Sequence, residues 1–534
     1  MLSNRLQKQF AAPIPLFLSQ DKGALKLELK PYLQPFEREL ALRELKALIG
    51  PDENIIEKFG YYIAYTDRSE ILMRSRLTYW QRVGRHELFP TIQKALEFTQ
   101  NGLAQSTNGE SLHNARRLRY GPHDLHDYRG KFFPQLARSL INISGIPDDG
   151  VVLDPMCGSG TTTCEALAAG RTSLSADLNP LSVLITRAKA GVVLEDATAF
   201  RDILSGYLKA FAFDHPSDLT SVWPAADLEY LRRWFSPHAI NDLAAIIVEL
   251  RKIRRPFYRD FLRVCLSNIV RSVSWQKEVD LRVRKEVRPY KSGTAIAGFT
   301  SEVEEQIDRI YPYLCVLPTQ QPLPVLHIEQ GDSVQLESLL PRYRGKVDLI
   351  VTSPPYATAL PYLDTDRLSL VILGLLPRGK QKAVEARMIG TREVSEKERE
   401  ESWQEFRRRE RELPKNVTRL IHEIAAHNHG PEVGFRRRNL PALLGRYFLA
   451  MRDAMLSARS MMRLNGRAYY VVGNNSSTVD GEKIEIPTDE FLFEIGASVG
   501  WGQDEMISME LLTSRDIFKE NRGSAETILC FTAR

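Results

Sequence analysis

The alternation of apolar and polar positions forms its clearest pattern near residue 151. A short apolar run, Val151 to Leu153, precedes a glycine turn at Gly158 to Gly160, and Thr161 to Ala169 has the composition of a helix. A second run of small and apolar residues, Ser173 to Asp177, follows. The order strand, glycine turn, helix, strand predicts a β-α-β unit, the opening of an α/β sheet.

Four more apolar runs predict that the sheet resumes much later in the chain. Three candidate strands are Val325 to Ile328, Val347 to Val351 and Arg467 to Gly473, and Glu526 to Phe531 is a candidate last strand. Between residues 195 and 325 the apolar positions recur at helical spacing. We therefore expect a helical insertion that interrupts the sheet.

The other segments predict accessory structure. Phe36 to Ile49 has the spacing of an amphipathic helix within an N-terminal accessory region, residues 1–120. A second helix is predicted from Leu444 to Leu464, ending at Asn465-Gly466. The segment Lys380 to Lys415 is dense in charges of both signs, which is typical of a solvated helix or a mobile arm outside the catalytic machinery.

These elements predict an α/β fold with a Rossmann-like sheet. We expect one half of the sheet domain at residues 121–195, the helical insertion at 196–324, and the other half at 325–534 with the charged arm at 380–415. A length of 534 residues suits two to four domains or one enlarged α/β domain.

Composition narrows the classes of protein. No uninterrupted apolar stretch approaches the roughly 18 residues of a membrane span, so we expect a cytoplasmic protein with no membrane partner. The five cysteines are scattered and form no Cys-x-x-Cys pair. This spacing predicts neither a disulfide framework nor a structural zinc site, and we expect no metal.

The charge distribution is more informative than the net charge of +5. Residues 251–291 contain thirteen Lys or Arg against four acids. Such a run is compatible with solvated helix faces and equally with a surface that binds phosphate groups. The candidate phosphate contacts are Arg254, Arg255, Arg282, Arg284 and Lys285.

Polar residues directly follow three of the predicted strands. Because ligands bind beyond the carboxyl ends of the strands in an open α/β sheet, these residues predict a nucleoside-shaped site. Glycines would let the backbone approach the ligand, Asp177 would accept hydrogen bonds from ribose hydroxyls, and Asp332 would face an adenine amine. The predicted contacts are Asp154, Met156, Gly158, Ser159, Gly160, Thr161, Asp177, Asn179, Asp332 and Ser333. No Gly-Lys-Ser/Thr follows the turn, so a P-loop is excluded.

A rigid turn, Ser353-Pro354-Pro355-Tyr356, follows the strand that ends at Thr352. Two prolines fix φ and remove two backbone donors, which leaves carbonyl oxygens that only accept hydrogen bonds. Ser353 and the Pro354 carbonyl would bind the hydrogens of an exocyclic amine and direct its lone pair, while Tyr356 would stack on a flipped base. Together the two motifs indicate methyl transfer from S-adenosylmethionine to an exocyclic nitrogen of a nucleobase.

On these residues the chain resembles the DNA amino-methyltransferases, which modify cytosine N4 or adenine N6. The family's donor motif is Asp-Pro-Phe-x-Gly-Ser-Gly-Thr, and Met156 stands here in place of the phenylalanine. Ser353, in the first position of the base-binding motif, is typical of the cytosine-N4 members. The segment His126 to Leu136 resembles the part of the family that closes over the methionine moiety, which assigns Lys131, Phe132 and Phe133 to the donor site. The resemblance covers roughly residues 120–190 and 325–534.

The resemblance implies a site-specific DNA methyltransferase of the restriction-modification type, with S-adenosylmethionine as methyl donor and direct transfer to a flipped base. The enzymes that methylate carbon 5 of cytosine use a Pro-Cys nucleophile, and this chain has no Pro-Cys dipeptide. Three alternatives stay open: an adenine-N6 DNA methyltransferase, an amino-methyltransferase of tRNA or rRNA, and a catalytically silent nucleic-acid-binding subunit of a defence system. A restriction or defence partner is compatible with either DNA alternative.

Overall fold

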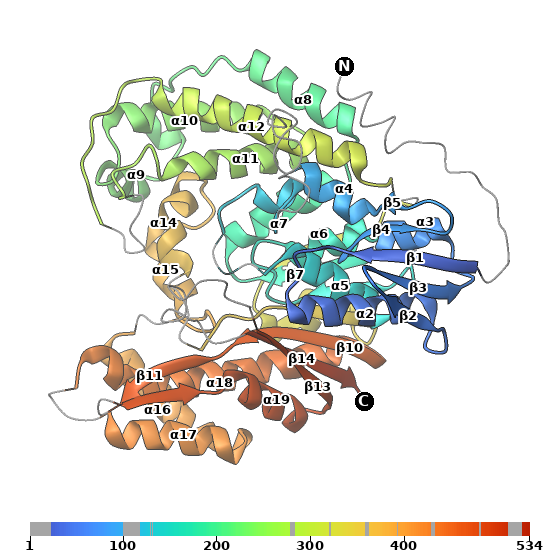
Figure 1. Ribbon diagram of the computed structural model, residues 1–534. Helices are drawn as coiled ribbons and strands as arrows, with labels where there is room; N and C mark the ends of the chain where they lie inside the picture. Colours follow the sequence, from blue (N-terminus) through green and yellow to red (C-terminus); the bar gives the residue numbers. More distant parts are fainter. Residues whose placement is uncertain are drawn as a thin grey trace.

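A computed structural model gives the fold. It describes residues 23–99, 118–128, 130, 132–277, 284–319, 322–357, 362–391, 394–428, 433–479, 482–510 and 526–534. Figure 1 shows a large central sheet with a small N-terminal sheet on one side, a layer of helices on another, and the C-terminal helices below. Among the described residues, none of the helices is both long enough and apolar enough to cross a membrane.

The central sheet has seven strands in the order β13-β14-β10-β9-β6-β7-β8. Strands β10, β9, β6, β7 and β8 pair in parallel, and β14 is antiparallel to both of its neighbours. Their bounds are β6 Val151–Asp154, β7 Thr172–Asp177, β8 Leu326–Gln330, β9 Val347–Thr352, β10 Met462–Gly473, β13 Trp501–Met509 and β14 Glu526–Ala533. The sheet is that of a Rossmann-like methyltransferase fold, as the sequence predicts.

Apolar side chains alternate between the two faces of this sheet, so each face has its own core. On one face, Val152 and Val351 pack with helix α5 and with the N-terminal region. On the other, Leu153 and Ile350 pack with the C-terminal helices. The helices involved are α5 Pro134–Ser144, α6 Thr161–Ala168, α13 Leu336–Leu339, α16 Glu396–Arg409, α17 Lys415–His427, α18 Phe435–Met461 and α19 Thr488–Ser498.

A layer of helices lies between β7 and β8 in the chain, although these two strands are neighbours in the sheet. The layer has a separate apolar core that includes Phe200, Leu243 and Phe261, and helix α14 packs against it. Its helices are α7 Pro180–Val193, α8 Ala197–Ala210, α9 Ala225–Arg232, α10 Pro237–Lys252, α11 Pro256–Val270 and α12 Thr294–Val316, and α14 is Tyr362–Ile372.

The N-terminal region contains more structure than its apolar pattern predicts. Its sheet has the order β2-β3-β1-β4-β5, and the predicted amphipathic helix is α2, Pro35–Ile49. The strands are short, which explains why the sequence pattern does not separate them from loops. They are β1 Gly23–Leu29, β2 Ile55–Lys58, β3 Tyr61–Thr66, β4 Trp80–Gly84 and β5 Phe89–Pro90, with helices α3 Glu70–Arg76 and α4 Ile92–Phe98.

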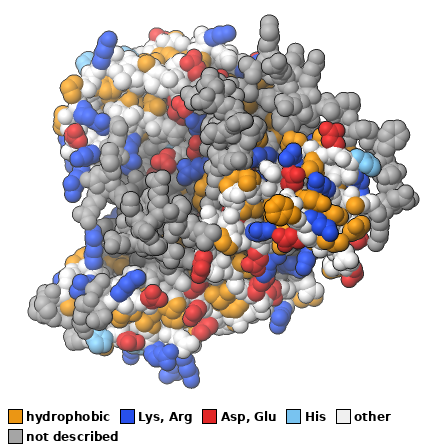
Figure 2. Space-filling view, viewed as in Figure 1, with side chains coloured by type: hydrophobic (Ala, Val, Ile, Leu, Met, Phe, Trp, Pro, Cys, Tyr) orange, Lys and Arg blue, Asp and Glu red, His pale blue; other side chains and the backbone are white. Residues whose placement is uncertain are grey.

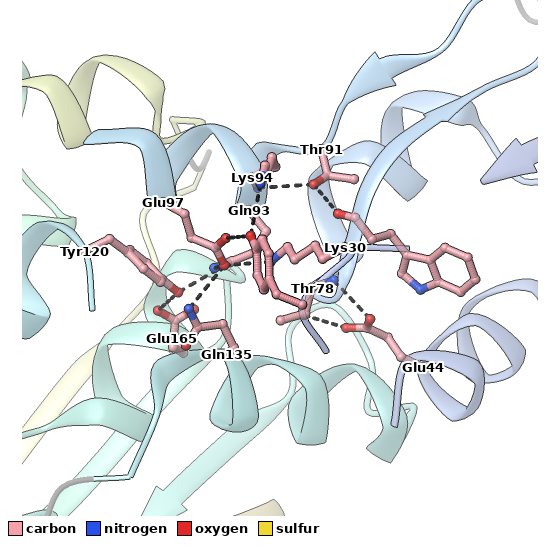
Figure 3. Close-up of polar contacts among 12 residues, drawn as sticks. Lys30, Glu44, Thr78, Thr91, Gln93, Lys94, Glu97, Tyr120, Gln135 and Glu165 are labelled. Carbon is pink, nitrogen blue, oxygen red and sulfur yellow. Dashed lines mark hydrogen bonds and ion pairs between the residues drawn. The ribbon is translucent and has the colours of Figure 1, made fainter. Parts of the chain in front are cut away.

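Buried polar contacts join this N-terminal region to the central sheet domain (Figure 3). Lys30 Nζ lies 2.6 Å from Glu97 Oε1, and Gln135 Nε2 of α5 donates to the same oxygen at 3.1 Å. Tyr120 OH donates at 2.9 Å to Glu165 Oε1 on α6. Because α6 begins at the glycine turn, these contacts tie the accessory region to the helix that supports the predicted ligand site.

Two further predictions about elements are corrected by the structure. The helix expected to end near Leu464 ends at Met461, and β10 already begins at Met462. The charged segment forms α15, Arg378–Glu385, then α16 and the start of α17. It is packed and is not simply a solvated arm, since Phe406 of α16 is fully buried against Gly445 of α18.

Candidate active site

The carboxyl ends of β6, β7, β8 and β9 border one pocket, with about 790 Å³ of empty space including its open mouth. Ligands of open α/β sheets bind at this position, beyond the carboxyl ends of the strands. The predicted site residues that line it are Phe132, Asp154, Met156, Gly158, Ser159, Thr161, Asp177, Asp332, Ser333, Ser353 and Pro355. Residues predicted from four separate strand ends thus meet in one place, here called the donor pocket.

The glycine turn owes its shape to two glycines with positive φ, Gly158 at 49° and Gly160 at 76°. A Cβ on Gly160 would lie 2.8 Å from the Thr186 side chain, so this glycine does not line the pocket but allows α6 to pack on α7. On Gly158 a Cβ would meet the Tyr128 ring at 3.1 Å. The Oγ of Ser159 is buried and has no hydrogen-bond partner among the described residues. A ligand with polar groups would satisfy it.

Asp177 joins the end of β7 to the glycine turn. Its Oδ2 accepts from Gly158 N at 2.8 Å and its Oδ1 from Asn179 N at 2.8 Å. Burial raises the pKa of Asp177 to about 6, in spite of these backbone hydrogen bonds. Asn179 lies outside the pocket lining and caps α7, since its side-chain oxygen accepts from Leu181 N at 3.0 Å.

Asp154 joins the donor pocket to the strand that precedes the proline turn. Its Oδ1 accepts from Thr352 Oγ1 at 2.7 Å and from Met156 N at 3.3 Å. Burial raises the pKa of Asp154 to about 7, with the nearby charge of Asp177 adding to the effect. The pKa values of both buried carboxyl groups therefore lie near neutral pH. Both groups would ionise more readily beside a cation.

The proline turn is fixed from two sides. Tyr447 OH of α18 donates to the Pro355 carbonyl at 2.9 Å. Tyr356 lies outside the donor-pocket lining, against Gly473 at the end of β10, and its hydroxyl donates to Glu526 at the start of β14. Pro354 is buried and also lies outside the lining. Of the four predicted catalytic residues, Ser353 and Pro355 face the donor pocket.

The structure adds a wall that the sequence does not predict. Arg387, Met388 and Ile389, which follow α15, line the donor pocket. Arg387 Nη2 lies 3.2 Å from Asp332 Oδ2, the carboxylate predicted to face an adenine amine. Because charged residues flank this segment, the sequence pattern does not distinguish it from the solvated helices around it. The signal that could have revealed it is the uncharged interruption Met388-Ile-Gly390 within the charged run.

The segment before the glycine turn also reaches the site. Phe132 and Tyr128 line the pocket, whereas Phe133 lies at the N-cap of α5 and is not part of the lining. Lys131 falls outside the described residues, as does Arg282. Tyr128 was within the segment singled out in the sequence but was not assigned to the site.

The predicted phosphate contacts do not form one cluster. Arg254 and Arg255 precede α11, whereas Arg284 and Lys285 follow it in a short bridge with Gln276. Helix α11, with fifteen residues and a length of about 22 Å, lies between the two groups in the chain. Figure 2 likewise shows acidic and basic side chains intermixed on the visible face.

The two groups also differ in their distance from the site. Arg263 Nη2 donates to Leu373 O and Ser267 Oγ to Ser369 Oγ, so α11 and α14 run antiparallel. The start of α14, nearest to the proline turn in the chain, therefore lies toward the end of α11 that Arg284 and Lys285 follow.

Cys157 lines the donor pocket, and burial raises the pKa of its thiol well above the usual value, so a thiolate is disfavoured. In the part of the chain that the structure describes, no group of three or more His, Cys, Asp or Glu side chains is placed to hold a metal ion.

Comparison with known proteins places this site in context. A family model described as the RMKL-like methyltransferase domain matches residues 125–198, which include the glycine turn and Asp177. Type II methyltransferase M.MvaI of Kocuria varians is 24% identical over 268 residues, covering 47% of this chain and 58% of the relative. Type II methyltransferase M.BsoBI of Geobacillus stearothermophilus is 23% identical over 303 residues, covering 51% and 54%.

A third relative is a tRNA (guanine(10)-N2)-dimethyltransferase of Methanothermobacter thermautotrophicus. It is 30% identical over 125 residues, covering 22% of this chain and 37% of the relative. The chain therefore spans little more than half the length of the two Type II relatives, and less of the third.

Proposed function

We propose that the chain is an S-adenosylmethionine-dependent amino-methyltransferase that methylates an exocyclic amine of a base in DNA, with cytosine N4 as the target atom. The observation that carries this proposal is the shared wall of the donor pocket. Ser353 and Pro355 of the proline turn line the same cavity as Asp177 and Asp332. A donor bound between the two carboxylates therefore lies beside a turn built to accept hydrogen bonds.

The donor pocket fits S-adenosylmethionine, which supplies an electrophilic methyl group when bound. Asp177 would accept the ribose hydroxyls, and the buried Ser159 hydroxyl would gain a polar partner. Asp332 and Arg387 stand at the side proposed for the adenine amine. The raised pKa values of Asp154, about 7, and Asp177, about 6, suit a site that receives a cation.

The proline turn would orient the amine. Ser353 and the Pro354 carbonyl would accept its hydrogens and direct the nitrogen lone pair into the donor pocket. Tyr447 would keep the turn in place through the Pro355 carbonyl. Tyr356 would stack on the flipped base from outside the donor pocket, a role consistent with its position beside Gly473.

The proposal further specifies DNA as the polymer and cytosine N4 as the target atom. The two longer alignments are to Type II methyltransferases, and Ser353 matches the first position of the cytosine-N4 motif. Both features support the modification of DNA as part of a restriction-modification system.

A second candidate function is methylation of an exocyclic amine in RNA. It is favoured by the alignment to the tRNA (guanine(10)-N2)-dimethyltransferase, which covers 22% of this chain. The same proline turn would serve any exocyclic amine, because its acceptors recognise the NH₂ group and not the polymer.

One experiment separates these candidates. The protein is incubated with isotopically labelled S-adenosylmethionine and either unmethylated bacterial DNA or total RNA, and the nucleosides are analysed by mass spectrometry. We expect labelled N4-methylcytosine from DNA, and much slower labelling with a Tyr356→Ala variant. Labelled N6-methyladenine would correct the target atom. Label found in RNA nucleosides and not in DNA would identify RNA, and not DNA, as the substrate.

A further inference from the structure

A second cavity adjoins the donor pocket, with about 920 Å³ of empty space including its open mouth. Glu385 and Ala386, at the end of α15, line this cavity, and the next three residues line the donor pocket. The two cavities thus share the segment that follows α15 as a common wall. Arg446 of α18 lines the opposite side.

The second cavity contains three cationic side chains, Arg378, Lys382 and Arg446, against Glu385 and Glu398. Lys382 Nζ lies 3.5 Å from Glu398 Oε1, so one positive charge is partly compensated. We call this site the arginine cavity after Arg378 and Arg446. The partners of these two side chains differ from that of Lys382.

Neither arginine forms an ion pair with a described carboxylate. Arg446 Nη2 donates to the Thr391 carbonyl at 3.2 Å, and burial lowers the pKa of its guanidinium. Arg378 Nη1 donates to Gln381 Oε1 at 2.7 Å, and the Arg378 guanidinium lies 5.3 Å from the centre of the Tyr230 ring. The charge of Glu398 acts on Arg446 without a direct ion pair, so both guanidinium groups keep N–H donors for an anion, and a phosphate accepts two parallel bonds from an arginine.

Helix α18 contributes to both the cavity and the support of the proline turn. Arg446 is followed by Tyr447, whose hydroxyl donates to the Pro355 carbonyl at 2.9 Å. On the other side, Leu363 near the start of α14 is only seven residues from Tyr356 in the chain. Helix α18 and the segment after α15 therefore connect the arginine cavity to the pocket that Ser353 and Pro355 line.

We propose that the arginine cavity binds a backbone phosphate of the DNA strand next to the flipped nucleotide. The proposal rests on the proposed function, and it names the groups that hold the strand at the site. Phosphate contacts of this kind fix the register of a nucleic acid without reading its sequence. Arg378, Lys382 and Arg446 would perform this role, in addition to any contacts made by the helical layer.

The test compares two doubly substituted proteins of equal charge. Arg378→Gln with Lys382→Gln removes two cations from the arginine cavity, where both side chains are exposed enough to change without loss of the fold. Lys380→Gln with Lys397→Gln removes two exposed cations from the same helices, α15 and α16, outside the cavity lining. Affinity for a fluorescent mixed-sequence DNA duplex is measured over a series of salt concentrations.

Each lost phosphate contact lowers the magnitude of the logarithmic salt slope by about one. Because the cavity is proposed to hold one phosphate, we expect the cavity variant to lose about one unit of slope and the control variant to keep the parent value. Affinity for S-adenosylmethionine should stay unchanged in both. Arg446→Met should slow single-turnover methylation while leaving donor affinity unchanged, because Arg446 does not line the donor pocket.

Equal salt slopes in the cavity and control variants would overturn the inference. If the parent protein still methylates DNA in that case, the proposed function stands without the arginine cavity. If the parent labels no nucleoside, the proposed function fails, and the salt slopes still decide whether the cavity binds phosphate.

Discussion

At the scale of single residues, the donor pocket depends on two carboxylates with different partners. Asp177 is bound by backbone N–H groups of Gly158 and Asn179, and Asp154 by the hydroxyl of Thr352. The first contact shapes the glycine turn, and the second connects β6 to β9 directly below the proline turn. Substitution of either residue should thus affect a different part of the site.

Asp177→Ala should weaken the binding of S-adenosylmethionine. The substitution removes the proposed ribose acceptor and both backbone hydrogen bonds, so we expect a loss of about 1–3 kcal/mol. Isothermal titration calorimetry measures the effect, with Asp202→Ala, on the exposed surface of α8, as control. Unchanged affinity in a folded Asp177→Ala protein would refute the proposed contact.

Donor binding should depend on pH near neutrality. Burial raises the pKa of Asp154 to about 7 and of Asp177 to about 6, and a cationic donor favours their ionised forms. Affinity should therefore fall as the pH drops from 7.5 to 5.5, a range chosen to span about these two values. At intermediate pH, binding should release protons, which calorimetry in buffers of different ionisation enthalpy detects. Binding without proton release would contradict this prediction.

The same carboxylates should influence the stability of the ligand-free protein. A folded pKa above the unfolded value favours the neutral form, so the contribution of Asp154 is complete below pH about 4 and disappears as the pH rises through about 7. Asp154→Asn cannot ionise. The free energy of unfolding of the parent, relative to this variant, should decrease between these two pH values in denaturant titrations. A constant difference would show that the environment of Asp154 does not disfavour its charge.

At the scale of elements, the proline turn is supported by α18, β10 and β14. Tyr356→Ala should slow methylation strongly while leaving donor affinity unchanged, because Tyr356 does not line the donor pocket. The loss of base stacking is worth about 1–3 kcal/mol. Tyr356→Phe is the matched control, which keeps the ring and removes the hydroxyl that donates to Glu526. Single-turnover rates compare the variants, and an undiminished rate for Tyr356→Ala would remove the stacking role.

Elements also explain which parts of the site could be predicted from the sequence. The glycine turn, Asp177 and the proline turn lie directly after apolar strands, so local pattern and topology place them on one edge of the sheet. Arg387 and Tyr447 could not be assigned in this way. Tyr447 reaches the turn from α18 and Arg387 reaches the pocket from the segment after α15, so their positions depend on tertiary packing and not on a strand end.

The same limit applies to the charged residues. The excess of Lys and Arg in residues 251–291 is a property of the sequence, but α11 separates Arg254 from Arg284. Charge density in a linear segment does not specify a surface when a helix runs through its centre. Conversely, Arg378 and Arg446 are far apart in the chain and share one cavity.

At the scale of the whole molecule, the N-terminal region and the central sheet share one core. Apolar residues of α2 and β4 pack with α5 and with Val152 and Val351 of the sheet. We therefore expect both parts to unfold together, without an intermediate that retains only one of them.

Glu97→Ala should test this coupling. It leaves Lys30 buried without its carboxylate and removes the acceptor for Gln135 of α5, at an expected cost of about 3–5 kcal/mol in unfolding free energy. The exposed pair of Arg38 and Glu57 provides the control, since Glu57→Ala should change stability by less than about 1 kcal/mol. Two separate transitions in denaturant, or equal effects of the two substitutions, would contradict a shared core.

The reversed direction of β14 has a practical consequence for engineering. Glu526, its first residue, pairs with Gly473 at the carboxyl edge of the sheet, whereas Thr532 pairs with Arg467 toward the opposite edge. A fluorescent label or a programmable DNA-binding module attached after Arg534 would thus leave the protein on the side away from the donor pocket. Such a fusion would leave the mouth of the donor pocket unobstructed.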